Sequence, residues 1–287
     1  MNSTAFSFNI IADLQAMLAY DFMRHAFEAG TVVAVVAGIV GYFVVIRRSS
    51  FAAHALSHIG FAGAAGAVLL GVNPVAGLLL FTSGGGVAMA TLGRRASERD
   101  VQIGAVLAFM LGLGVLFISL YSGYATEAYS LLFGEVLGVS RGDVLLTLAA
   151  AAVILATIAL IYRPLLFASL DEDVAEAKGV SIFWIGVIFM LLIAVATSMA
   201  VQVVGVLLIF ALMVTPAAAA QQMTQRPLRG ILVSVLIALL ATWFGIFISF
   251  YTPYPVSFFI ASVTFLVYVA SRFYRANSGV LFRPIKK

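Results

Sequence analysis

The stretch AGTVVAVVAGIVGYFVVI, residues 29–46, decides the fold of this chain. It carries no charged residue, and its length is close to the roughly 20 apolar residues that a helix needs to cross a bilayer. Two basic residues, Arg47 and Arg48, follow it directly. We interpret the stretch as a membrane-spanning helix that ends at a polar interface.

Runs of this kind recur along the whole chain. They fall at about residues 55–72, 74–92, 103–121, 144–162, 181–199, 202–220, 229–250 and 255–271. Of the 287 residues 63% are hydrophobic and 10% are charged, and the mean hydropathy is +1.12, which water cannot solvate as a globule. The sequence therefore predicts an all-α integral membrane protein, a polytopic bundle of about eight to nine spans. We expect residues 1–287 to form a single transmembrane domain.

Residue types and motifs that are missing from the sequence exclude several functions. The chain has no cysteine, which excludes disulfides, thiolate metal ligands and a cysteine nucleophile. It also has no G-x-x-x-x-G-K-[ST] phosphate loop, so it is not expected to hydrolyse ATP or to be an enzyme. Residues 1–28 are predicted to form an amphipathic N-terminal segment without the basic and apolar regions of a cleavable signal. The net charge of +4 gives no reason to expect a nucleic-acid partner.

The basic residues predict the orientation, because Lys and Arg accumulate in short cytoplasmic loops. With nine spans, all but two of the 16 basic residues fall on one side, the exceptions being Arg24 and Arg141. The sequence thus predicts an external N-terminus and a cytoplasmic C-terminus. The join near residues 199–202 is too short for a normal loop, so one element there is expected to be broken or partly spanning.

Two polar segments lie between the spans. Residues 167–181 carry helix signals, with capping-box spacing, acidic residues in the first turn and a C-cap glycine, at Ser169, Asp171, Glu172, Asp173 and Gly179. From these residues alone, a solvated connector remains the simpler interpretation. Residues 123–143, on the external side, are too polar to span and are predicted to re-enter the bundle, bringing Glu127, Glu135 and Asp143 to its outer face.

The segment FAAHALSHIG, residues 51–60, places His54 and His58 four residues apart at the start of a predicted helix. Four residues advance a helix by about 400°, so both imidazoles share one face and can contact one ion. Ala55 stands where zinc peptidases carry their general base, which argues against a peptidase. Further donors could come from Glu135, Asp143, carbonyls freed near Thr215 by Pro216, or water. The third histidine, His25, is expected at the interface.

The order of several segments resembles a known family. GYFVVIRRSSFAAHALSHIGFAGAAGAVLLGVNP, RRASERDVQIGAV, LLFGEVLGVSRGDVL, DEDVAEAKGVS and VVGVLLIFALMVTPAAAAQQM resemble, in the same order, segments of the membrane permease of bacterial zinc and manganese ABC importers. The likeness covers nearly the whole chain. It implies a type II ABC importer-like fold and a homodimer that works with a cytoplasmic ABC ATPase dimer and an external metal-binding protein.

The resemblance also implies residue roles. His54 and His58 match the family's metal positions, and Glu135 is a weaker candidate. Residues 167–180 would be the coupling helix that docks on the ATPase, and the residues assigned to this contact are Asp171, Glu172, Asp173, Glu176 and Gly179. Residues 272–287 would be a cytoplasmic tail. Many family members have Asp where His54 stands, and two imidazoles tilt the expected ion toward zinc over manganese or iron. Relatives often carry Asp-x-Pro-x-Gly where this chain has YTPYPVSFF.

The expected function is therefore ATP-driven import of a divalent transition-metal ion by alternating access. No permanently bound cofactor is expected, since the ion is the cargo. A proton-coupled secondary metal transporter and an ABC permease for iron chelates or vitamin B12 remain alternatives, as does a structural membrane subunit.

Overall fold

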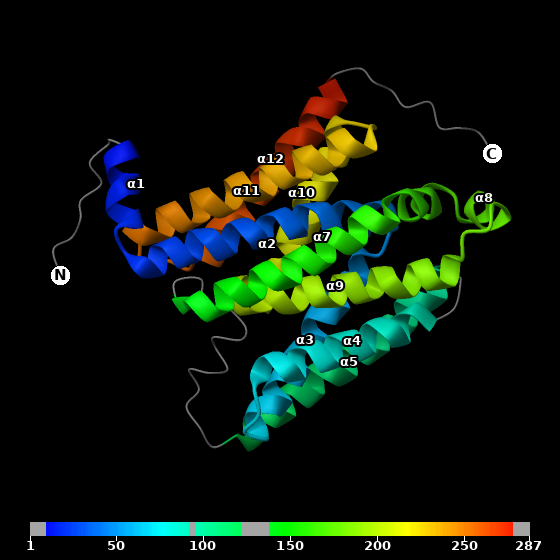
Figure 1. The fold of residues 1–287 in the computed structure, drawn as a ribbon, viewed down its shortest axis with the longest axis horizontal. Helices are drawn as coiled ribbons and strands as arrows, with labels where there is room; N and C mark the ends of the chain where they lie inside the picture. Colours follow the sequence, from blue (N-terminus) through cyan, green and yellow to red (C-terminus); the bar gives the residue numbers. More distant parts are fainter. Residues whose placement is uncertain (1–9, 92–95, 122–137, 278–287) are drawn as a thin grey trace.

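In the computed structural model of the chain, the described residues are 10–91, 96–121 and 138–277, and this part is almost entirely helical. The helices are α1 (Ile10–Leu18), α2 (Asp21–Ile46), α3 (Ser50–Leu69), α4 (Pro74–Thr91), α5 (Ala96–Leu120), α7 (Arg141–Leu170), α8 (Glu172–Ala177), α9 (Ile182–Val204), α10 (Val206–Met223), α11 (Pro227–Tyr251) and α12 (Val256–Asn277). The long helices run side by side, while the short α1 lies across one end of the bundle (Figure 1).

All nine apolar runs predicted from the sequence are helices. Within the described residues, eight of them are long and apolar enough to cross a membrane, and α10 has a shorter apolar part, Leu208–Met223. The prediction of an all-α bundle of eight to nine spans is confirmed.

Three predicted boundaries were wrong. Helix α2 begins at Asp21, so residues 21–28 continue the first span instead of forming part of a separate amphipathic segment. Helix α7 continues to Leu170 through Pro164, and α12 extends to Asn277, which takes residues 272–277 out of the predicted tail. Residues 278–287 lie outside the described part. Backbone hydrogen bonds continue a helix into its polar ends, where hydropathy no longer marks it.

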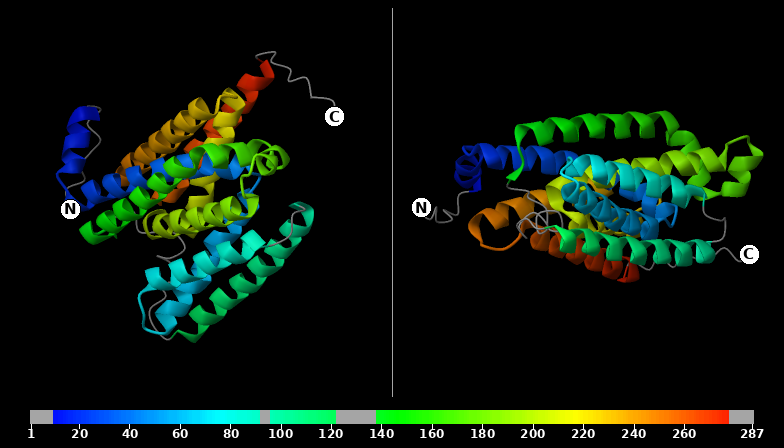
Figure 2. Two further views of the ribbon diagram at one scale, coloured as in Figure 1. Left: turned by 45° about the vertical axis from the view of Figure 1, so that its right-hand side comes forward. Right: turned by 90° about the horizontal axis from the view of Figure 1, so that it is seen from below.

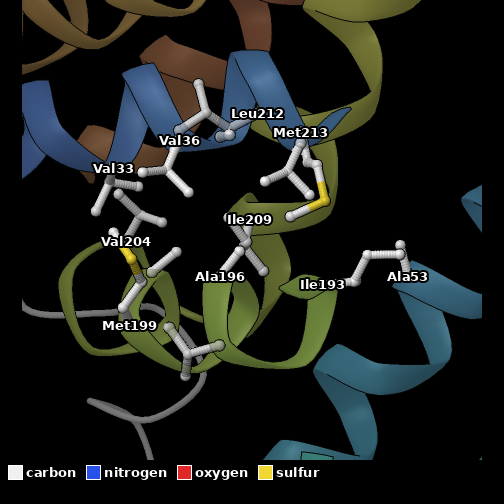
Figure 3. Close-up of a cluster of buried hydrophobic side chains, with 14 of the residues drawn as sticks. Val33, Val36, Ala53, Ile193, Ala196, Met199, Val204, Ile209, Leu212 and Met213 are labelled. Atoms are coloured by element: carbon white, nitrogen blue, oxygen red, sulfur yellow. The ribbon is translucent and has the colours of Figure 1, made fainter. Parts of the chain in front are cut away.

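The predicted break lies between α9 and α10, three residues beyond the expected join. Gly205 alone separates the two helices, with φ 81° and ψ 163°, a conformation essentially restricted to glycine. The chain thereby turns within the core, in the buried cluster to which Val33 and Val36 of α2 and Ile209, Leu212 and Met213 of α10 belong (Figure 3).

Helix α3 packs closely on its neighbours through small residues. A Cβ on Gly63 would collide with the carbonyl oxygen of Gly77 on α4 and with the Phe81 side chain. One helix later, Thr82 of α4 and Ser198 of α9 share a buried hydrogen bond of 2.8 Å. These contacts fix α3 between α4, α5, α9 and α10.

The described chain starts and ends toward opposite ends of the bundle. In both views of Figure 2, α1 lies at one end and the last turns of α12 point toward the other. Helix α8 also lies at the end away from α1 (Figure 1).

Candidate metal-ion site

The two histidines predicted as ligands lie in the first two turns of α3. Their ring centroids are 4.7 Å apart and the ring planes are nearly perpendicular, at 86°. A zinc ion bound to histidine lies about 2.0–2.1 Å from each nitrogen. His54 and His58 therefore lie against each other on one face of α3, and the binding of one ion by both rings stays a prediction.

The surroundings of this pair are apolar. The third ring of the cluster belongs to Phe210 of α10, whose centroid is 4.8 Å from that of His54. Ala55, Leu56 and Ile59 beside the pair are all buried. The Nδ1 atoms of both histidines are buried and have no hydrogen-bond partner among the described residues.

Unpaired buried nitrogens are rare in proteins and call for an explanation. Neutral imidazole nitrogen suits divalent transition metals, so the donor set fits such an ion as cargo. Within the described residues no group of three or more His, Cys, Asp or Glu side chains gathers, so the pair offers an incomplete coordination sphere. An ion held by two donors alone can be released more easily than one in a closed site.

The other donors considered from the sequence have different outcomes. Glu127 and Glu135 fall outside the described residues. Asp143 forms a capping box at the start of α7, where its backbone N–H donates to Ser140 Oγ at 3.2 Å and its carboxylate accepts from the Ser140 hydroxyl at 2.6 Å. That carboxylate therefore already has a structural role. Thr215 and Pro216 lie within α10.

A groove of about 790 Å³ lies elsewhere, between α1, α2, α7 and α11. Its lining is apolar apart from Glu28 and Thr31, and includes the exposed side chains of Leu148, Trp243 and Phe244. Such a surface suits hydrocarbon and not a metal ion. The groove is therefore separate from the histidine pair.

The polar helix predicted at residues 167–180 is shorter than expected, and the predicted cap was wrong. Helix α8 covers only Glu172–Ala177, and its N-cap is Asp171, whose carboxylate accepts from the Val174 backbone N–H at 3.0 Å. Ser169 instead belongs to α7, because its hydroxyl donates to the Leu165 carbonyl.

The end of α8 agrees with the sequence. Gly179 has φ 84°, and the N–H groups of Gly179 and Val180 donate to the carbonyls of Glu176 and Ala175 at 2.9 and 3.0 Å. This is the hydrogen-bond pattern of a Schellman C-cap.

Helix α8 is exposed apart from Ala175, which is fully buried. Its Glu172 carboxylate lies 3.7 Å from the guanidinium of Arg47, which caps the C-terminus of α2. The Arg47 side chain is only 10% exposed and also lies over the Phe189 ring of α9, at 5.4 Å. The ion pair therefore connects helix α8 to the C-terminus of α2, just before the start of α3, which carries both histidines.

Sequence reasoning missed Phe210 and the link between Arg47 and Glu172. Phe210 is one of 23 phenylalanines and sits in a uniformly apolar run, so no local signal distinguishes it. The partners in each contact are more than a hundred residues apart, and only packing brings them together.

Comparison with known proteins defines the class. Residues 19–275 match the ABC 3 transport family, and the chain belongs to that family. The fold is similar to PsaBC from Streptococcus pneumoniae in complex with Fab, with a TM-score of 0.82, 28% sequence identity and coverage of 91% of this chain and 95% of that chain. An inward-facing putative metal-chelate type ABC transporter is similar in fold, with a TM-score of 0.67 over 86% and 85% of the chains at 16% identity.

Curated relatives extend the similarity over almost the whole chain. The manganese transport system membrane protein MntC of Listeria monocytogenes is 27% identical over 270 residues, which is 94% of this chain and 96% of the relative. A probable metal transport system membrane protein of Treponema pallidum is 32% identical over 255 residues, 88% of this chain and 94% of the relative. The chain is therefore a membrane permease of the type II ABC fold, without an ATPase of its own.

Proposed function

We propose that this permease imports a divalent transition-metal ion, moving it by alternating access between an external binding protein and the cytoplasm. The observation that carries the proposal is the His54 and His58 pair, with two buried nitrogens that lack partners among the described residues. The names of the relatives support it, since they refer to manganese, to metal and, for YfeC of Yersinia pestis, to chelated iron.

Zinc is the favoured cargo in this proposal, with manganese and iron next. Two imidazoles form a softer donor set than one carboxylate and one imidazole, and nitrogen donors favour zinc over manganese. The relatives named for manganese weigh in the other direction. A transport assay in which zinc and manganese compete would decide between the donor chemistry and the names of the relatives.

Helix α8 is the proposed coupling helix. A second copy of the chain would complete the permease, and an ABC ATPase dimer on the cytoplasmic side would bind its exposed acidic turn, with Asp171, Glu172, Asp173, Glu176 and Gly179 at or near the contact. The ion pair between Glu172 and Arg47 supports this role. Through this pair, movement of α8 would displace the end of α2 and with it the start of α3. A conformational change driven by ATP hydrolysis in the separate ATPase would thus be transmitted to the helix that carries His54 and His58.

The proposed location is the bacterial cell membrane, with the N-terminus outside and the C-terminus in the cytoplasm. Support comes from the distribution of basic residues and from the placement of α1 and the end of α12 toward opposite ends of the bundle (Figure 2).

Ion uptake by the complete complex in proteoliposomes tests the function. Changing the outer partners of metal ligands commonly costs 10–100-fold in affinity or activity, so losing a ligand in His58→Ala should lower ATP-dependent zinc uptake at least about tenfold. His25→Ala is the matched control, since His25 lies near the start of α2 and should leave uptake unchanged. Normal zinc, manganese and iron uptake by His58→Ala would reject the site.

The same assay separates the alternatives. Uptake driven by a pH gradient, without the ATPase or ATP, would favour a proton-coupled secondary transporter. Uptake of an iron chelate or vitamin B12 instead of free ions would favour a chelate permease. Failure to transport any of these substrates with both partners present would leave a structural subunit.

A further inference from the structure

Phe210 of α10 contacts the candidate site without offering it a donor atom. Its ring lies 4.8 Å from that of His54 and is tilted by 60°. His54 therefore contacts two rings, since the His58 ring lies 4.7 Å from it. Phe210 is five residues beyond Gly205, at the start of a helix that packs on both α2 and α3.

Metal-binding histidines are normally oriented by a hydrogen bond from their second ring nitrogen to a carboxylate, a carbonyl or water. Nδ1 of His54 is unpaired among the described residues, so no hydrogen bond at this atom orients the ring before an ion binds. The contact of the His54 ring with Phe210 of α10 is a packing constraint that another helix supplies.

We propose that Phe210 is the positioning residue of the histidine pair, holding the His54 imidazole beside His58 in place of the usual hydrogen bond. This inference rests on the proposed function of the pair.

The expected effect follows from the strength of aromatic contacts. Such pairs contribute about 0.5–1.5 kcal/mol beyond their buried area, which corresponds to roughly a two- to tenfold change in affinity. Phe210→Ala should therefore weaken ion binding by about this factor without abolishing it. Phe210→Tyr, which keeps the ring, should bind the ion nearly as well as the unchanged protein.

The test measures binding of Co²⁺ to the purified permease–ATPase complex without nucleotide, using visible absorption to report coordination by ring nitrogen. The matched control is Met213→Ala, a buried position on the same helix that packs on Gly41 of α2. Met213→Ala should leave Co²⁺ affinity unchanged. In transport, Phe210→Ala should raise the KM for zinc about as much as it weakens binding and leave kcat nearly unchanged.

A double-mutant cycle identifies the partner. If Phe210 acts through His54, Phe210→Ala should have no further effect on Co²⁺ affinity once His54→Ala is present. Equal losses in the Phe210→Ala and Met213→Ala variants, or an undiminished effect in the His54→Ala background, would overturn the inference. Phe210→Leu, which fills the space without a ring, replaces Phe210→Ala if that variant fails to fold.

The two proposals fail in different ways. Unchanged Co²⁺ binding and uptake in both His54→Ala and His58→Ala would refute the function of the pair itself. Loss of binding in those variants together with full affinity in Phe210→Ala would refute only the role of Phe210.

Discussion

Helix α2 can approach α10 closely because residue 41 is a glycine. A Cβ at this position would collide with the carbonyl oxygen of Met213, a backbone atom that cannot move without the helix. Small residues allow transmembrane helices this close an approach. The close approach of α2 to α10 therefore depends on the absence of a side chain at Gly41.

Gly41→Ala should destabilise the permease by about 1–3 kcal/mol, because it overfills a close helix crossing. Thermal unfolding of the purified complex in detergent measures the change. Gly112→Ala is the matched control, since nothing lies within 4 Å of a Cβ added there. It should be neutral or slightly stabilising, because Ala favours helix over Gly by about 1 kcal/mol. Equal melting temperatures for the two variants would contradict this account of the crossing.

Among the elements, the division between α9 and α10 determines where Phe210 lies. Gly205 has φ 81°, and its N–H donates to the Val201 carbonyl at 2.9 Å, which ends α9. Helix α10 then begins at once at Val206. A residue with a Cβ would strain this turn, so the position of α10 against α3 depends on the glycine.

Gly205→Ala should cost about 1–3 kcal/mol of stability and also weaken ion binding, because α10 carries Phe210. Gly186→Ala in α9, where an added Cβ meets nothing within 4 Å, provides the comparison. Melting curves and Co²⁺ titrations of both variants measure the two effects. Unaltered ion affinity in a destabilised Gly205→Ala protein would show that the turn at Gly205 does not affect the candidate site.

The ion pair between α8 and the end of α2 gives a second prediction at this scale. Glu172 is exposed while Arg47 is largely buried, so we take about 1 kcal/mol, the upper end of the range for exposed pairs. Arg47→Glu or Glu172→Arg alone should then lower the number of ions transported per ATP about fivefold. The charge-swapped double variant should recover part of this loss. Ion uptake and phosphate release measured in the same proteoliposomes give the ratio, and a swap no better than either single variant would argue against the link.

The whole molecule has its two described ends toward opposite ends of a bundle of long helices (Figure 2). Arg47, the start of α3 and helix α8 gather at the end away from α1, so the candidate coupling element and the histidine helix share one corner (Figure 1). In the proposed mechanism, a movement of α8 would therefore act on the start of α3 through the end of α2.

The orientation can be measured by cysteine labelling, because the chain has no cysteine of its own. We expect Tyr20→Cys, between α1 and α2, to react with a membrane-impermeant maleimide in intact spheroplasts. Asn277→Cys, at the end of α12, should react only after the membrane is opened. The reverse pattern would invert the proposed topology, and labelling of both positions on one side would contradict an odd number of crossings.

Much of this protein could be predicted from the sequence because the relevant signals are local. Hydropathy marked all nine apolar helices, since each must satisfy its own backbone hydrogen bonds in the membrane. Helical periodicity placed His54 and His58 on one face, and Gly179 marked the end of α8. The ends of helices were predicted less well. Ser169 has the spacing of an N-cap, but the hydrogen bonds of α7 continue past it.

The sequence by itself determined the class of fold, the helices and the paired imidazoles. Only the tertiary structure decided which ring faces His54, where Arg47 finds its carboxylate and how closely α2 approaches α10. The physical reason is that apolar residues in a membrane helix look alike along the chain, because lipid and protein interiors are equally apolar. Which of them meets a partner depends on helix crossings between segments far apart in sequence.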